Sequence, residues 1–245
     1  MDAKMEITWR PGTRDFIVFQ FSAVTVLVLL SLSAYLFTHY TGHGKLLGLI
    51  PFLDVSEEQS LPTYFSSLNL LLSSLLLFLL YVITRGGDFR RYRYWLYLSL
   101  LFLLLSVDEA SSIHEKFTQL QRYTGVLVPF IQTHSWILYG VLFTVVVGVF
   151  FIPFLVALPA RTALLMMLAG AIFLCGAIGV ESLGAWFRYR NIAGHHDLMD
   201  NLRRLVEESC EMYGIALFNC VLFREIVAAR AGFTVIPGGP RDQSI

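Results

Sequence analysis

Six apolar runs, each near 20 residues long, dominate the sequence and restrict the folds open to it. An α-helix of about 20 residues crosses the roughly 30 Å hydrocarbon core of a bilayer. Backbone inside lipid must satisfy its own hydrogen bonds, so each run predicts a helix. The expected spans are residues 16–40, 63–84, 95–117, 136–158, 163–187 and 205–228. The sequence therefore predicts an all-α, polytopic transmembrane bundle over residues 1–232, followed by a disordered tail at 233–245.

The composition agrees with a membrane location. Hydrophobic residues make up 56% of the chain and charged residues 15%, whereas soluble domains carry about 25% charged residues. The formal net charge is zero, which argues against a nucleic-acid partner. We expect a multi-pass protein of a cell membrane, the inner membrane of a bacterium, with membrane lipids as its surroundings.

The orientation follows from the positions of the basic residues. Arginines cluster between the second and third expected spans, at Arg85, Arg90, Arg91 and Arg93. Short cytoplasmic loops carry an excess of Lys and Arg. This cluster predicts that both termini lie on the cytoplasmic side.

Acidic residues occur within the third, fifth and sixth expected spans. At 1.5 Å of rise per residue, Asp108 lies about 20 Å above Trp95 and Glu211 about 18 Å above Phe223. Glu181 and Glu207 lie slightly closer to the same, extracytoplasmic side. A charged side chain at such depth costs roughly 2.5–3.5 kcal/mol on insertion scales. These residues are therefore candidates for a functional site.

Helical spacing suggests which acids share a face. Asp108 and Glu115 are seven residues apart and lie on one face of a continuous helix, whereas Glu109 and His114 point to either side of it. Either the helix is broken here, or only some of these residues join one site.

The sixth span carries three acidic residues at helical spacing. Glu207 and Glu208 lie four and three residues before Glu211, so both pairs can face one centre, and their like charges repel. Arg203 and Arg204 could neutralise Glu207 and Glu208 by i,i+4 pairing.

Convergence of these side chains predicts a site for a divalent metal ion. Carboxylates and imidazoles in helical bundles suit zinc, iron or manganese. The predicted ligands are Asp108, His114, Glu115, Glu181, Glu207 and Glu211. A metal with an open position activates water, and a neighbouring carboxylate moves protons. The leading hypothesis is a metal-dependent membrane hydrolase acting on a lipid or another amphiphile, with Asp108, Glu115 and Glu211 as catalytic residues.

Two other functions stay open at this point. Asp108 and Glu211 could bind a proton or cation in an ion-coupled transporter, although the sequence contains no internal repeat. Alternatively, the carboxylates could pair with arginines and serines to lock the helices of an accessory or assembly subunit in a membrane complex.

Two motifs carry a resemblance to known proteins. The segment Leu105–Glu115, with its Asp-Glu and His-Glu pairs, and the Glu-rich segment Glu207–Gly214 resemble segments of a group of bacterial multi-pass membrane proteins. That resemblance covers the third to sixth spans and implies no particular activity. The chain is also distantly similar to ceramidase-like membrane hydrolases, which implies an intramembrane zinc site. It departs from them because its one H-x3-H pair, His39 and His43, lies on the first span.

Overall fold

The computed structural model describes residues 12–57, 59–86, 91–113, 136–190 and 198–232. Within these ranges the chain is helical and contains no strand. Six helices are long and apolar enough to cross a membrane: Thr13–Thr41, Leu61–Thr84, Arg93–Ser111, Ile137–Leu155, Ala160–Phe187 and Leu198–Ala229. The predicted fold class is confirmed, and the orientation stays a prediction.

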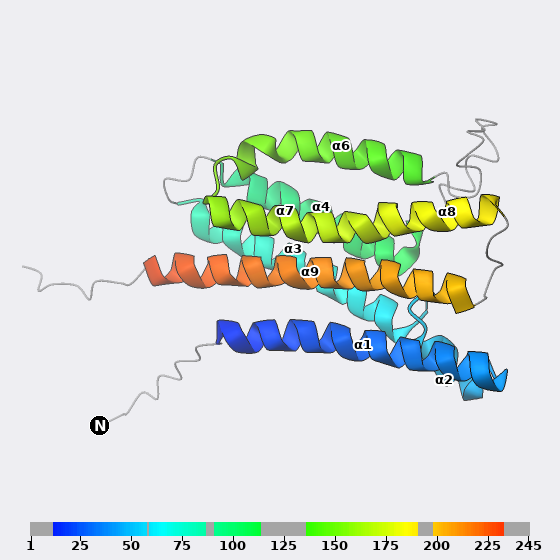
Figure 1. Ribbon diagram of the computed structural model, residues 1–245. Helices are drawn as coiled ribbons and strands as arrows, with labels where there is room; N and C mark the ends of the chain where they lie inside the picture. The colour runs from blue at the N-terminus through cyan, green and yellow to red at the C-terminus, as the bar shows by residue number, and fades with distance from the viewer. Residues whose placement is uncertain (1–11, 58, 87–90, 114–135, 191–197, 233–245) are drawn as a thin grey trace, which may run out of the picture.

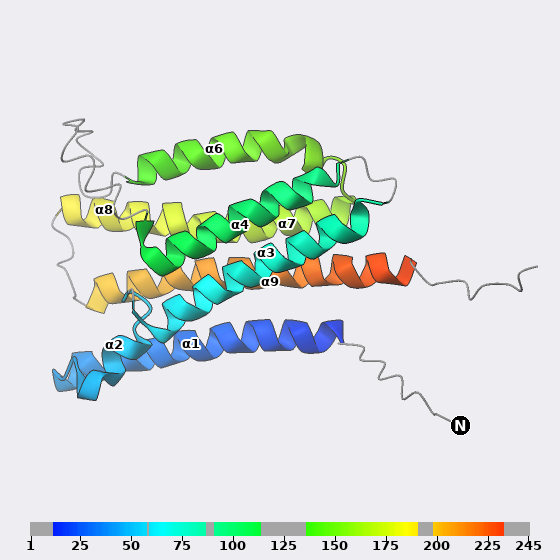
Figure 2. The ribbon, with the colours of Figure 1, turned by 180° about the vertical axis from the view of Figure 1, so that it is seen from behind.

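Helix α9 (Leu198–Gly232) is the central helix of the bundle. It packs against α1 (Thr13–Thr41), α3 (Leu61–Thr84) and α7 (Ala160–Leu174), as Figures 1 and 2 show from opposite sides. More than half of the residues in its most apolar stretch are buried, a larger share than in any other candidate membrane span of the described chain. Polar side chains on α9 are therefore shielded by neighbouring helices instead of facing lipid.

Helix α4 (Arg93–Ser111) is joined to α3 by two reciprocal pairs of serine hydrogen bonds. Ser74 Oγ donates to the Ser99 carbonyl oxygen at 2.8 Å, and Ser99 Oγ donates to the Ser74 carbonyl oxygen at 2.9 Å. Ser67 and Ser106 repeat the arrangement at 2.9 and 2.8 Å. Small hydroxyl residues let helices approach closely in lipid. These two serine clasps fix the position of α4 along α3.

The fifth span consists of three continuous segments. Helix α7 leads into a π-helical segment, η2 (Cys175–Val180), and then into α8 (Glu181–Tyr189). Helix α6 (Trp136–Leu155) lies beside this span, at the outside of the bundle (Figure 1). Gly176 in η2 and Gly184 in α8 both lie against α9, since a Cβ on either would clash with it. Glycines therefore allow the fifth span to pack closely on the central helix.

The short apolar segment after α1 folds back along that helix. It forms η1 (Leu46–Gly48) and α2 (Leu49–Leu53). Ser31 Oγ donates to the Leu53 carbonyl oxygen at 2.6 Å, and Tyr35 Oη donates to Asp54 Oδ1 at 2.5 Å. Neither of these short helices is long enough to cross a membrane.

Two helix ends differ from the expected bounds by six residues or more. Helix α4 ends at Ser111 instead of near residue 117, because Ser112 adopts the left-handed conformation (φ 47°, ψ 45°). Helix α9 begins at Leu198 instead of near 205. Its first turns are polar and carry ion pairs, so hydropathy does not reveal them. The predicted disordered tail at 233–245 lies outside the described residues.

Candidate functional site

Carboxylates from three helical segments gather at one end of the bundle. Glu109 lies on α4, Glu181 begins α8, and Glu207, Glu208 and Glu211 lie on α9. Glu109, Glu181 and Glu207 each interact electrostatically with both Glu208 and Glu211. The prediction that acids of the third, fifth and sixth spans approach one another is therefore met by this acidic cluster.

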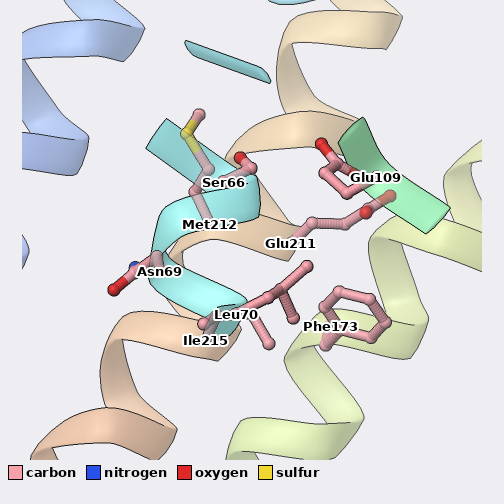
Figure 3. Close-up of a pocket in the computed structure, with 8 residues that line it drawn as sticks. All are labelled: Ser66, Asn69, Leu70, Glu109, Phe173, Glu211, Met212 and Ile215. Atoms are coloured by element: carbon pink, nitrogen blue, oxygen red, sulfur yellow. The ribbon is translucent and has the colours of Figure 1, made fainter. Parts of the chain in front are cut away.

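A pocket opens beside the acidic cluster. It encloses about 260 Å³, including the part open to solvent. In Figure 3 the side chains of Glu109 and Glu211 extend from α4 and α9 toward the same space. The pocket is lined by Ser66, Asn69, Leu70, Glu109, Phe173, Glu211, Met212 and Ile215. Two carboxylates thus share a small pocket whose other walls are largely apolar.

The arginine pairing on α9 follows the prediction at one residue and departs from it at another. Arg203 Nη1 donates to Glu207, and Arg203 Nε donates to Asp200 Oδ1 at 3.2 Å. Arg204, in contrast, pairs with Asp200 at 3.2 Å and not with Glu208. Its charge still interacts with Glu208 electrostatically. The predicted pairing of Arg203 with Glu207 is confirmed. The predicted pairing of Arg204 with Glu208 is wrong, because the Arg204 guanidinium group binds Asp200, one turn earlier on α9.

Within the acidic cluster, Glu208 and Glu211 are the two carboxylates for which the described residues provide no direct partner. In the described part of the chain, neither carboxylate makes a hydrogen bond or an ion pair. Both are partly buried and lie near three further carboxylates. Neighbouring carboxylates in a poorly hydrated site do not all ionise unless a cation balances them. The arrangement is therefore suited to taking up a proton or a metal ion.

The third span presents a different acidic residue from the one expected. Glu109 lines the pocket, whereas Asp108 does not. The helix that carries Asp108 ends at Ser111, with Ser112 in the left-handed conformation, whereas the shared face with Glu115 was predicted for a continuous helix. His114 and Glu115 lie outside the described residues, and their roles stay predictions.

The structure gives no direct support to the predicted ligand set. Among the described residues, no three His, Cys, Asp or Glu side chains are arranged to hold a metal ion. Four of the predicted ligands, Asp108, Glu181, Glu207 and Glu211, are among these described residues. His39 and His43 are exposed near the end of α1.

Sequence reasoning missed the contribution of α3. Ser66 and Asn69 line the pocket, and Asn69 Oδ1 accepts a hydrogen bond from Asn219 Nδ2 at 2.8 Å. Ser73 Oγ donates to Asn219 Oδ1 at 2.6 Å. The available signal was the row of Ser and Asn residues within an otherwise apolar span, because polar side chains in a span usually face other helices.

A family model described as "Domain of unknown function (DUF8692)" matches residues 21–226. This chain belongs to the DUF8692 family. No curated protein and no solved structure shows a significant match to it. The region shared with the DUF8692 family runs from within α1 to within α9 and includes the whole acidic cluster. The pocket is therefore part of the family's domain.

Proposed function

We propose that this protein binds a divalent metal ion in the acidic pocket and uses it to hydrolyse a lipid or another amphiphile. The observation that carries the proposal is the pair Glu208 and Glu211, two carboxylates with no direct partner in the described ranges, beside three more carboxylates. Two carboxylates without a direct partner, beside other carboxylates, are a reason for the site to hold a cation.

The donor atoms indicate which metal suits the pocket. Carboxylates of Glu109 and Glu211 and the hydroxyl group of Ser66 line it, and oxygen donors of this kind suit manganese or magnesium. Of the three predicted metals, manganese is therefore our first choice. A bound metal would supply Lewis acidity, while a neighbouring carboxylate such as Glu208 would carry protons.

The size and place of the pocket suggest the substrate class. The space in the pocket that a water-sized sphere can occupy is about 10 Å³, roughly the minimum for one water molecule. An ion fits this space, whereas a lipid or its headgroup does not. The pocket lies between helices that are long and apolar enough to span a membrane, so the substrate class that suits its position is one that partitions into the bilayer.

A second candidate function is proton or cation transport. It is favoured by the lack of a three-ligand metal group in the described segments, since two unpaired carboxylates suffice to exchange a proton. Transport requires a path to the other side of the membrane. The cluster of buried apolar residues around Leu77, Phe154 and Leu222 lies along this route, which makes transport the weaker of the two.

Metal analysis of the purified protein tests the proposal. We expect about one manganese, zinc or iron ion per chain in the wild type and its loss in Glu211→Gln and Glu109→Gln. The matched control is Glu225→Gln, because Glu225 also lies on α9 but bonds to Thr162 and Arg224 away from the cluster. This control should retain the metal.

The remaining outcomes separate the alternatives. No metal in the wild type, and no binding in titrations with the three ions, would refute the metal proposal. Proton flux in metal-free liposomes that Glu211→Gln abolishes would then favour transport. Neither metal nor flux, with stable co-purification of other membrane proteins, would favour the subunit function.

A further inference from the structure

An exposed group of apolar side chains lies where the chain leaves α1 and folds back. We call it the apolar tip and define it as Tyr40, Leu46, Leu47, Leu49 and Phe52. Leu47 is completely exposed and Tyr40 is 82% exposed. The other three side chains are about half exposed. The tip thus presents aromatic and aliphatic groups that the described protein does not cover.

The backbone of the apolar tip is strained. Leu46 and Leu47 have φ angles of 32° and 56°, in the left-handed region that favours glycine. Such conformations persist where the surrounding structure holds them, and they occur often at functional sites. Since the Leu47 side chain touches little of the protein, packing within this chain does not explain its presence.

The opposite side of the same segment is fixed to the bundle. Ile50 and Val55 are buried, and Val55 belongs to an apolar cluster with residues of α1 and α9. The hydrogen bonds from Ser31 to Leu53 and from Tyr35 to Asp54 hold the return path against α1. The apolar tip therefore cannot cover itself by folding onto the bundle.

The apolar tip is continuous with the surface that α1 presents to lipid. Leu53 lies beside Ser31, which is ten residues, or about 15 Å, before the end of α1 at Thr41. The exposed side chains of Leu36 and Phe37 occupy this same stretch of α1. Exposed apolar side chains thus extend along α1 to the apolar tip, with the polar His39 and His43 exposed between them.

We propose that the apolar tip inserts into the membrane leaflet at this end of the bundle, with membrane lipid as its partner. Tyr is enriched at membrane interfaces because its ring is amphipathic. The exposed Lys45 precedes the two strained leucines, and its ammonium group can extend to lipid phosphates while its stem stays apolar. This inference does not depend on the proposed metal site.

Spin labelling of the full-length protein in phosphatidylcholine nanodiscs tests the proposal. Cys175, Cys210 and Cys220 are first replaced by Ala, and a nitroxide is attached to Leu47→Cys. Leu29→Cys on the exposed surface of α1 is the lipid control, and Gln59→Cys is the water control because Gln59 is polar and exposed. The measurement compares relaxation by oxygen, which concentrates in lipid, with relaxation by a water-soluble nickel chelate.

We expect the oxygen-to-nickel ratio at Leu47 to match that at Leu29. A ratio equal to that at Gln59 would overturn the proposal, as would spin–spin broadening that places a second copy of the chain on the tip. If the cysteine-free chain does not fold, a photoreactive amino acid is placed at position 47 of the native chain. Lipid adducts found there, and absent with the same group at position 59, would support the proposal; equal adducts at both would refute it.

Discussion

Gly176 in the π-helical segment lies directly on the backbone of Glu207. A Cβ atom on Gly176 would approach the Glu207 carbonyl oxygen to 2.5 Å and the Glu211 Cγ to 3.0 Å. The fifth span thus contacts α9 at Glu207 and Glu211, two residues of the acidic cluster. The separation of these helices, and with it the shape of the acidic cluster, depends on one missing methyl group.

Gly176→Ala should therefore disturb both stability and the site. The added methyl group meets backbone, which cannot rotate away, and overpacking of this kind costs about 1–3 kcal/mol. We expect a lower unfolding midpoint in mild detergent and weaker cation binding. Gly170→Ala is the control: its Cβ meets nothing within 4 Å, and alanine stabilises a helix by roughly 0.5–1 kcal/mol relative to glycine. Equal effects of the two substitutions would contradict this account.

Arg203 holds the first turns of α9 in place, so Arg203→Met should be strongly destabilising. The side chains of Arg203, Asp200 and Glu207 are 8%, 6% and 13% exposed. Removing one partner of a buried ion pair costs about 3–5 kcal/mol, because it leaves a charge uncompensated. Arg224→Met removes a more exposed pair at the other end of α9 and should cost less than about 1 kcal/mol. Denaturation curves of both variants give the comparison.

The two serine clasps should differ in their effect on the pocket. Ser67 is adjacent to Ser66, and Ser106 precedes Glu109 by three residues. Replacing Ser67 and Ser106 together by Ala should cost about 1 kcal/mol, since hydrogen bonds between membrane helices contribute about 0.6 kcal/mol on average. It should also weaken cation binding. The same change at Ser74 and Ser99 should cost as much stability and leave binding unchanged. Binding affected equally by both double variants would argue against a positioning role.

Asn219 connects α9 to α3 in the buried part of the bundle. Its Nδ2 donates to the Asn69 backbone oxygen at 3.1 Å and to Asn69 Oδ1, while its Oδ1 accepts from Ser73. Asn219→Ala leaves those groups unsatisfied, which costs about 1–3 kcal/mol. Asn219→Asp keeps an oxygen that accepts from Ser73. At a pH at which the carboxyl group is protonated, it should therefore reduce the stability less than Asn219→Ala does. Thermal unfolding at two pH values measures the difference, and a variant as stable as wild type would contradict it.

The spans were predictable because hydropathy alone identifies them, but the details of the site depend on packing. A rotation of one residue, about 100° around a helix, decides whether Asp108 or Glu109 faces the pocket. That rotation is set by the contacts of Ser67 and Ser106, which periodicity does not reveal. A break in this helix was one of the two alternatives that the spacing of its acidic residues left open, but its position at Ser112 was not predictable, because serine is not a characteristic helix terminator. The acidic cluster was predictable, because a carboxylate within a span is energetically costly and therefore faces the interior of the bundle, where other polar side chains lie.

The π-helical segment determines which residues of the fifth span face α9. Eight residues separate Gly176 from Gly184, and an uninterrupted α-helix would turn them about 80° apart. Both nevertheless lie on α9, one against Glu207 and the other against the guanidinium group of Arg203. The wider turns of residues 175–180 remove this phase difference, as a single inserted residue in an α-helix would. Deleting one residue there should restore regular winding and leave both glycines facing α9, because seven residues turn within about 20° of two full turns. Inserting one further residue should instead rotate Glu181 by about 100° away from its neighbours, so this segment tolerates a shorter chain better than a longer one.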